Sequence, residues 1–267
     1  MVWYNIFFPG KMQMKRSGFF DLKAIFPKIF SLPGHILIPH CCPVCGNVTC
    51  DGSANMFCKE CLEGFHFVKT PVCPKCGGEH NGILLECGEC LSIPGRRPWQ
   101  EAAALFIMTG SVKEVIYEYK YRSRLELCRP LGRLGAELLR GKEWDTDLVT
   151  FIPLHPLRYL QRGYNQSSLL AERIGAELEL PVKGVLFRKK HTKAQAKLKR
   201  EERLKNMKDS FGVLPWRKEF CKGKTILLVD DVMTTGATLS AGADALLAAG
   251  AEKVYIFILA RRAKDLH

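Results

Sequence analysis

The sequence predicts an α/β fold, in which a parallel sheet flanked by helices follows a small cysteine-rich module. The 267 residues suffice for one domain of ordinary size and a smaller module. Residues 226–229 form a short apolar run, typical of a strand buried in a parallel sheet, and an Ala- and Leu-rich helical pattern follows. Four Cys-x-x-Cys pairs lie within residues 42–90, which sets that segment apart from the rest of the chain.

Residues 1–40 are predicted to be an N-terminal segment with a short amphipathic helix. Phe and Ile side chains recur at helical spacing between Phe19 and Phe30, and we expect this face to pack against the cysteine module. Charged residues interrupt any signal-peptide core, and no uncharged apolar run reaches the roughly 18 residues of a membrane span. We therefore expect no stable membrane insertion. Met12 and Met14 are alternative start sites.

Residues 41–93 are predicted to be a double zinc-ribbon module. Glycine or proline flanks most of the cysteine pairs, as in zinc knuckles, where two thiolates converge on one tetrahedral ion. A module this small buries little apolar surface, whereas structural zinc contributes roughly 10–16 kcal/mol to small domains. We expect two structural Zn²⁺ sites, with the pairs joined either sequentially or in a cross-braced order. The predicted ligands are Cys42, Cys45, Cys58, Cys61, Cys73, Cys76, Cys87 and Cys90, while Cys41 and Cys50 have no assigned role.

Residues 94–267 are predicted to form the α/β domain, which a proline-rich linker at 94–98 joins to the module. Helical spacing predicts helices at 111–121, 125–139, 165–178 and 238–249. Apolar runs predict strands at 102–108, 148–153, 209–214 and 254–260, in addition to the run at 226–229. The strand at 148–153 is expected to be the first central strand of the sheet.

Two acidic residues and a Thr/Gly loop follow the run at 226–229. Because open α/β sheets bind ligands at the carboxyl ends of their strands, Asp230 and Asp231 are candidate ligand-binding residues. Their carboxylates can accept hydrogen bonds from ribose hydroxyl groups or hold Mg²⁺ through its waters. Backbone N–H groups of the loop, at the positive end of the next helix, can bind a phosphate. The loop residues are Thr234, Thr235, Gly236, Ala237 and Thr238. The sequence therefore predicts a sugar-phosphate site, and the alternative is a solvated strand end with Thr238 as helix N-cap.

The stretch ILLVDDVMTTGATL resembles the phosphoribosyl-pyrophosphate (PRPP) signature of type I phosphoribosyltransferases, and nearly the whole chain resembles the ComF family of competence proteins. RGYNQ at 162–166 closely matches a ComF hallmark, and a Lys-Tyr pair of that family corresponds to Lys120 and Tyr121. The resemblance implies a type I phosphoribosyltransferase-like sheet. It also implies that Asp230 and Asp231 contact the ribose hydroxyls and that the Thr/Gly loop surrounds the 5-phosphate.

Two arginines follow the strand expected at 148–153. In the architecture of the resembling family this loop faces the pyrophosphate, and guanidinium groups bind phosphate oxygens in bidentate fashion. Arg158 and Arg162 are therefore candidate pyrophosphate ligands, and Arg162 joins the two aspartates in the predicted catalytic set. Asn165 is either a site residue or a helix N-cap, and Lys120 is either a site residue or a solvated lysine.

The densest positive charge lies at 183–208. By the family resemblance this is a mobile segment that closes over the reacting sugar and carries Thr192, Gln195, Leu198, Arg203 and Asn206. The formal net charge of +13 favours polyanionic partners such as nucleic acid, a phosphorylated small molecule or an anionic membrane surface. For the segment at 183–208, the alternative is a solvated basic helix without a binding function. The candidate nucleic-acid-binding residues are Arg188, Lys189, Lys190, Lys193, Lys197, Arg200 and Arg203.

Two hypotheses about function follow. In the favoured one, the resemblance implies a cytoplasmic protein of natural transformation, which handles incoming single-stranded DNA with a DNA-uptake helicase and recombination-loading proteins. Its PRPP-type site would then sense a ligand, such as PRPP or a related phosphosugar, or be reused for a nucleotide phosphate. In the other, the chain is a Mg²⁺-dependent phosphoribosyltransferase that displaces pyrophosphate from PRPP in favour of a nucleobase or another small acceptor. The two hypotheses are compatible with each other. Cysteines paired within one segment of a long chain point to metal binding in a reducing cytosol.

Overall fold

The computed structural model describes residues 41–48, 57–93, 97–189 and 210–262. The predicted helix within 1–40, part of the linker and most of the basic segment at 183–208 lie outside these residues. The chain divides into two compact units, 1–39 and 40–267, and the structure below is that of the second unit. The predicted boundary between a cysteine module and an α/β domain stays a prediction.

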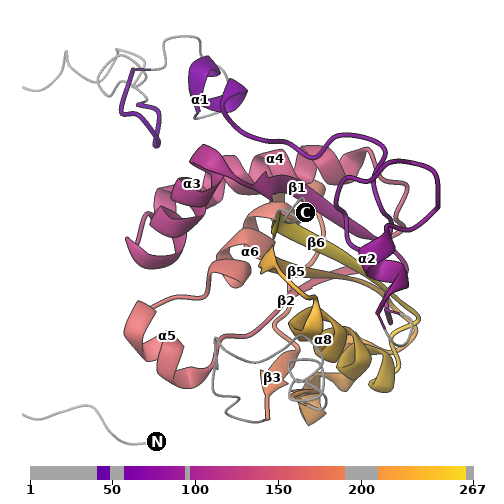
Figure 1. The fold of residues 1–267 in the computed structure, drawn as a ribbon. Coiled ribbons are helices and arrows are strands. Elements are labelled where there is room, and N and C mark those ends of the chain that lie inside the picture. The colour runs from indigo at the N-terminus through magenta and orange to yellow at the C-terminus, as the bar shows by residue number, and fades with distance from the viewer. Residues whose placement is uncertain (1–40, 49–56, 94–96, 190–209, 263–267) are drawn as a thin grey trace, which may run out of the picture. The chain divides into compact units, whose positions relative to one another are not determined.

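A parallel sheet of four strands, in the order β1-β6-β5-β2, forms the centre of this unit (Figure 1). The strands are β1 (Ala102–Met108), β2 (Leu148–Phe151), β5 (Thr225–Met233) and β6 (Lys253–Arg262). The sequence prediction of a parallel sheet flanked by helices is confirmed. The prediction that residues 148–153 form a central strand is wrong, because β5 separates β2 from β6 and leaves β2 at one edge of the described sheet. That edge is partly covered, since Val149 forms a parallel bridge with Val182.

The two faces of the sheet carry separate apolar cores, so side chains that alternate along β5 belong to different cores. Ile226 and Leu228 pack with α8 (Ala237–Ala248) on one face. Leu227 and Val229 pack with α3, α4 and α6 on the other. Burial on both faces explains why the strand is apolar at every position from Ile226 to Val229.

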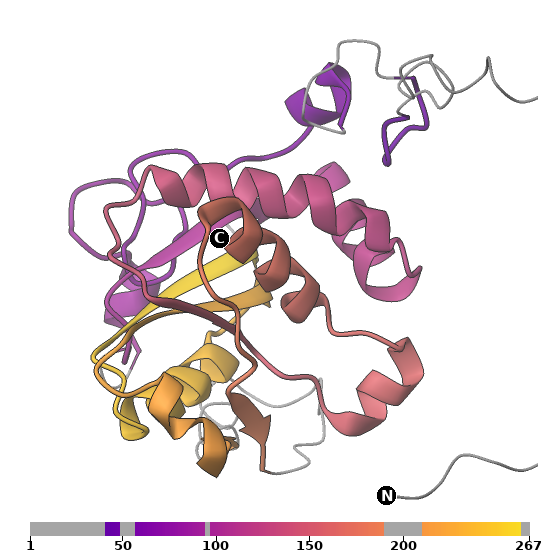
Figure 2. The same ribbon diagram turned by 180° about the vertical axis from the view of Figure 1, so that it is seen from behind.

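Three long helices build the second face (Figures 1 and 2). They are α3 (Gly110–Tyr121), α4 (Cys128–Arg140) and α6 (Gln166–Leu178). The predicted inward face of α3 is confirmed, since Val112, Val115, Ile116 and Tyr119 are all buried. The helix predicted at 125–139 is instead a short 3₁₀ turn, η2 (Leu125–Leu127), followed by α4.

The remaining elements are short. Helix α5 (Pro156–Arg162) follows β2, and an antiparallel pair of strands, β3 (Leu186–Arg188) and β4 (Phe211–Val213), packs near α8. The 3₁₀ helix η3 (Pro215–Phe220) precedes β5, and the cysteine-rich segment contains α1 (Lys59–Glu63) and α2 (Gly88–Leu91). None of the helices in the described part of the chain has the length and apolar character needed to cross a bilayer.

The contact between α4 and β6 yields a test of the packing. A Cβ at Gly135 would lie 2.6 Å from Cζ of the buried Phe257 ring. We expect Gly135→Ala to lower the free energy of unfolding by about 1–3 kcal/mol through overpacking, measured by urea denaturation. Gly141→Ala is the control, because its Cβ would meet only Leu138 O at 3.5 Å, an ordinary contact. Equal effects of the two substitutions would contradict the packing described here.

Candidate functional site

The predicted sugar-phosphate motif lies at the carboxyl end of β5, where the strand turns into α8 (Figure 1). Asp230 and Asp231, the acid pair, are still within β5, and Thr234 and Thr235 form the turn. Gly236 is the N-cap of α8, with a left-handed φ of +81°. The alternative in which Thr238 caps the helix is therefore wrong, since Thr238 lies inside the first turn.

Asp230 is half-buried and accepts two hydrogen bonds on Oδ1. Ser167 Oγ donates one at 2.9 Å, and the backbone N–H of Asp231 donates the other at 2.9 Å. Burial, together with the adjacent Asp231 carboxylate, raises the pKa of Asp230 to about 7. The ionised form of Asp230 is therefore disfavoured in the ligand-free protein. Hydroxyl donors or a cation at this position would favour it.

Asp231 forms an ion pair with Lys120 from the end of α3. Lys120 Nζ lies 3.0 Å from Asp231 Oδ1, and the two side chains are only 18% and 15% exposed. The alternative of a freely solvated Lys120 therefore does not hold. The pair brings α3 into contact with the motif on β5, although the two segments are far apart in the sequence.

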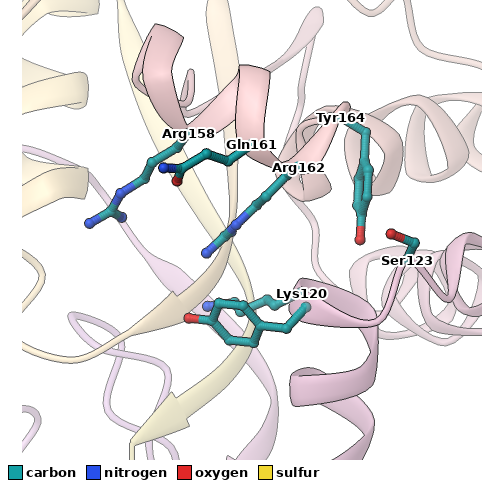
Figure 3. Close-up of a pocket in the computed structure, with 7 residues that line it drawn as sticks. Lys120, Ser123, Arg158, Gln161, Arg162 and Tyr164 are labelled. Carbon is teal, nitrogen blue, oxygen red and sulfur yellow. The ribbon is translucent and has the colours of Figure 1, made fainter.

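A cavity of about 440 Å³ opens beside this ion pair, and we refer to it as the cationic pocket (Figure 3). Arg158 and Arg162 extend into it from α5, and Lys120 faces them from α3. The structure thus brings together the two arginines that the sequence assigns to pyrophosphate, and adds the lysine. The lining residues are Lys120, Tyr121, Ser123, Arg158, Gln161, Arg162 and Tyr164.

Arg162 also has structural partners. Its guanidinium lies 4.7 Å from the centre of the Tyr121 ring, and Nη1 donates to Gln166 Oε1 at 3.3 Å. Such contacts hold the guanidinium plane in place and leave its other N–H groups available to an anion in the pocket.

The RGYNQ segment joins three elements through hydrogen bonds. Asn165 caps α6 by accepting from Ser167 N, and its amide donates to Ile152 O at 3.0 Å, so its capping role is confirmed. Tyr164 Oη donates to Tyr119 O at 2.8 Å, and Gln166 Nε2 donates to Lys120 O at 3.1 Å. These bonds fix the end of α3, and with it Lys120, against α6.

Two buried arginines, which the sequence does not mark as site residues, donate hydrogen bonds to backbone carbonyls at the Thr/Gly loop. Arg261 Nη1 donates to the carbonyls of Met233 and Thr234, at 3.2 and 2.6 Å. Arg97 Nη2 donates to Thr235 O at 3.4 Å, and its guanidinium lies 5.0 Å from the Trp99 ring. The sequence shows these residues only as parts of a linker and of a strand end. Their burial, which marks them as internal supports, depends on tertiary structure.

Only the first two residues of the predicted nucleic-acid-binding set are described. Arg188 ends β3 and lies 5.4 Å from the Phe211 ring. Burial and the positive charge of Arg158 lower the pKa of Arg188, and the Asp230 carboxylate acts in the opposite direction. Arg188 is therefore close to the acid pair, and Lys189 is exposed. The other five, Lys190, Lys193, Lys197, Arg200 and Arg203, lie outside the described residues.

The eight paired cysteines form two groups of four. Cys42, Cys45, Cys58 and Cys61 make the first cysteine group, and Cys73, Cys76, Cys87 and Cys90 make the second. Within each group the sulfur atoms lie within 4.8 Å of one another, so the pairing is sequential and the cross-braced alternative is wrong. The hydrogen bond from the Cys76 thiol lowers the pKa of Cys73, and Cys87 acts in the opposite direction. Four convergent sulfur donors fit a tetrahedral, thiophilic ion such as zinc.

Comparison with known proteins shows the family to which the chain belongs. A family model described as the phosphoribosyl transferase domain matches residues 165–266. The chain is 31% identical over 211 residues to the DNA utilization protein YhgH of Escherichia coli (strain K12), covering 76% of this chain and 89% of YhgH. The chain belongs to the ComF/YhgH family. It is also 28% identical over 227 residues to competence protein F of Haemophilus influenzae, covering 78% of this chain and 97% of that protein.

The chain is also similar to a solved structure that is more distant in sequence than these two relatives. The glutamine PRPP amidotransferase from B. subtilis, solved with ADP and GMP, is 20% identical, with a TM-score of 0.38. The match covers 54% of this chain and 30% of the amidotransferase chain.

The approach of Arg97 to Gly236 yields a test of the loop. A Cβ at Gly236 would lie 2.1 Å from Arg97 Nη1, in addition to the strain at positive φ. Gly223 has a similar φ of +64° but open space around it. We expect both Gly236→Ala and Gly223→Ala to lower stability by about 1 kcal/mol or more, and Gly236→Ala to lower it further because of the contact with Arg97. Only Gly236→Ala should weaken the binding of ribose 5-phosphate, measured by calorimetry. Equal weakening in both variants would contradict a specific role for the loop.

Proposed function

We propose that the carboxyl end of β5 binds a PRPP-type phosphosugar together with Mg²⁺. The observation that carries the proposal is the Lys120–Asp231 ion pair at 3.0 Å, because it joins the acid pair directly to the cationic pocket. The 5-phosphate would lie on the N–H groups of the Thr/Gly loop, and the ribose hydroxyls on the acid pair. The pyrophosphate would then extend toward Arg158 and Arg162.

The charges of the site match this ligand. The acid pair can hold Mg²⁺ through its waters, and the ion neutralises phosphate charge when it is bound. Three cationic side chains converge on the pocket where the most highly charged part of PRPP would lie. The proposed ligand is therefore complementary to both halves of the site, the acidic and the basic.

Transfer of the phosphoribosyl group is the second candidate function. The bond from C1 to the pyrophosphate oxygen would break, with its electron pair leaving on pyrophosphate, and an acceptor nitrogen or oxygen would bond to C1. Lys120, Arg158 and Arg162 favour this reaction, because fixed cations stabilise the charge that develops on the leaving group. The acceptor would be a nucleobase or another small molecule, and release of pyrophosphate across a panel of acceptors would detect it.

We also propose that the protein handles single-stranded DNA during DNA uptake in the cytoplasm, with a DNA-uptake helicase and recombination-loading proteins as partners. Membership of the family that includes competence protein F and DNA utilization protein YhgH supports this role. The geometry adds an aromatic surface beside the pocket. Tyr117 and Tyr121 are 51% and 56% exposed, with ring centres 5.1 Å apart. Exposed aromatic rings next to cations are what single-strand binders use to stack bases and hold phosphates.

The two cysteine groups are proposed to bind one structural zinc ion each. Each group offers four sulfur donors, so no coordination position remains for a substrate or an activated water. The metal would stabilise the cysteine-rich segment, in which α1 and α2 are only 5 and 4 residues long.

Removing the charge of the acid pair tests the phosphosugar site. We expect Asp230→Asn/Asp231→Asn to weaken Mg²⁺-dependent PRPP binding at least about tenfold in calorimetry, because ribose and magnesium ligands are lost. The control is Asp145→Asn/Asp147→Asn, which removes the same charge before the start of β2, at the opposite end of the sheet. Unchanged PRPP affinity in the first variant would remove the site assignment.

The substitution Asp230→Asn is expected to change PRPP binding and thermal stability in opposite directions. The folded-state pKa of Asp230 is raised from 3.8 to about 7, so the stability of the ligand-free protein falls as pH rises between these values. We expect Asp230→Asn to raise the melting temperature at pH 8, where the wild-type carboxylate is ionised, while PRPP binding is weakened. A lower melting temperature at pH 8 would show that the carboxylate stabilises the empty site.

The DNA proposal is tested on the exposed tyrosines. We expect Tyr117→Ala/Tyr121→Ala to weaken binding of a single-stranded oligonucleotide at least about tenfold, since each stacked base contributes roughly 1–3 kcal/mol. Fluorescence anisotropy at several salt concentrations should show a steep salt dependence. Tyr159→Ala is the matched control, because Tyr159 is also 51% exposed but does not line the pocket. A flat salt response, or equal losses in both variants, would count against the proposal.

A further inference from the structure

The second cysteine group is connected to the Thr/Gly loop by Arg261, a buried residue near the end of β6. Glu89 lies between Cys87 and Cys90 in α2, and its carboxylate accepts from Arg261 Nη2 at 2.5 Å. The other terminal nitrogen of the same guanidinium holds the carbonyls of Met233 and Thr234. One planar, rigid group thus spans from the cysteine group to the start of the loop.

A second connection runs through residues near the linker. Lys75 lies between Cys73 and Cys76, and its ammonium donates to Trp99 O at 2.9 Å. The Trp99 indole in turn donates to Lys75 O at 3.0 Å, and Arg97 stacks on its ring. Arg97 then donates to Thr235 O. Arg97 is buried and its Nε has no hydrogen-bond partner among the described residues. Its position is therefore set by this stack and by the loop.

The backbone of the second cysteine group is fixed against the sheet as well. Ala102 N donates to Pro74 O at 2.6 Å, which joins the knuckle to the start of β1. A Cβ at Gly77 would lie 2.6 Å from Ala104 N, so the chain touches the strand without an intervening side chain. The four cysteines share one apolar core with Met233 and Leu239, on the two sides of the loop.

Glu89 lies in a segment that has little regular structure of its own. Helix α2 has 4 residues, too few to be stable by itself, and Cys87 and Cys90 flank Glu89 directly. A metal ion bound to the four thiolates would fix both flanking residues. It would thereby hold the Glu89 carboxylate on Arg261.

We propose that the metal ion of the second cysteine group positions the Thr/Gly loop for phosphate binding, through Glu89–Arg261 and Lys75–Trp99–Arg97. The ligand classes are a thiophilic tetrahedral cation in the cysteine group and the 5-phosphate of a sugar on the loop. The inference rests on the proposed function. Coupling between two binding sites is reciprocal, so a bound phosphosugar also slows loss of this metal ion.

The first cysteine group provides an internal control, because its contacts lead elsewhere. Ser111 Oγ donates to Gly64 O at 2.7 Å, and Arg124 Nη2 donates to Pro43 O at 2.6 Å, both toward the region around α3. The two groups also contain equivalent glutamates. Glu60 stands between Cys58 and Cys61 as Glu89 stands between Cys87 and Cys90, and Glu60 is exposed.

The first experiment compares Glu89→Gln with Glu60→Gln in the full chain. Each variant removes one charge at the same position of a cysteine knuckle and keeps all eight thiols. We expect Glu89→Gln to weaken ribose 5-phosphate binding about tenfold in calorimetry, a typical coupling between sites, and Glu60→Gln to leave it unchanged. Zinc content, measured by mass spectrometry, should stay at two ions per chain in both.

Equal affinities in the two variants, with ribose 5-phosphate binding by the wild type intact, would overturn the inference alone. Absence of ribose 5-phosphate binding by the wild type would instead overturn the proposed function on which it rests.

The second experiment reads the coupling from the metal side. A chelator in excess should release zinc from the wild-type chain in two phases, one for each cysteine group. Ribose 5-phosphate should slow only one phase, about fivefold or more, and Glu89→Gln should abolish this effect. Slowing of both phases, or of neither, would show that the phosphate loop and the second cysteine group are not coupled.

Discussion

Repulsion between two adjacent carboxylates at the end of a buried strand is the constraint around which the site is built. Burial and the adjacent Asp231 carboxylate both disfavour the charged form of Asp230 and raise its pKa. The surrounding elements each supply compensation: Ser167 from α6, Lys120 from α3 and the more distant charge of Arg188 from β3. Residues that are remote in the sequence thus converge on the acid pair and supply partners from several directions.

The sequence predicts the elements well where local chemistry determines them. The strand at 102–108 is found with the same bounds, and the buried face of α3 is found residue by residue. Regular Cys-x-x-Cys spacing likewise predicts two four-cysteine groups. The order of the strands in the sheet is harder to predict, because a short apolar run does not indicate which strands will lie beside it. The sequence therefore does not reveal that β2 lies at the edge of the described sheet.

The residues of the candidate site likewise fall into those that local sequence indicates and those that only the fold reveals. The residues of the acid pair and the Thr/Gly loop form one continuous motif, and the arginines of α5 follow a predicted strand, so the sequence alone brings them forward. Lys120 and Arg97 act through contacts across more than a hundred residues, with Asp231 and Thr235, and Arg261 contacts Thr234 from near the end of β6. An arginine in a linker and one in a strand end look solvated in a sequence. Only the fold reveals that both are buried under the loop.

Because the apolar interior is divided into two cores, the proposed metal and the proposed DNA would affect the site from opposite faces of the sheet. The second cysteine group belongs to the core on the α8 face, whereas α3, which carries Lys120 and the paired tyrosines, belongs to the core on the other face. The sheet is the wall between them, and β5 contributes side chains to both. Metal on one side would therefore act on the Thr/Gly loop, whereas single-stranded DNA bound on the other side would act on Lys120 and the acid pair. Metal binding and DNA binding would then be two separate ways to change the affinity of one phosphosugar site.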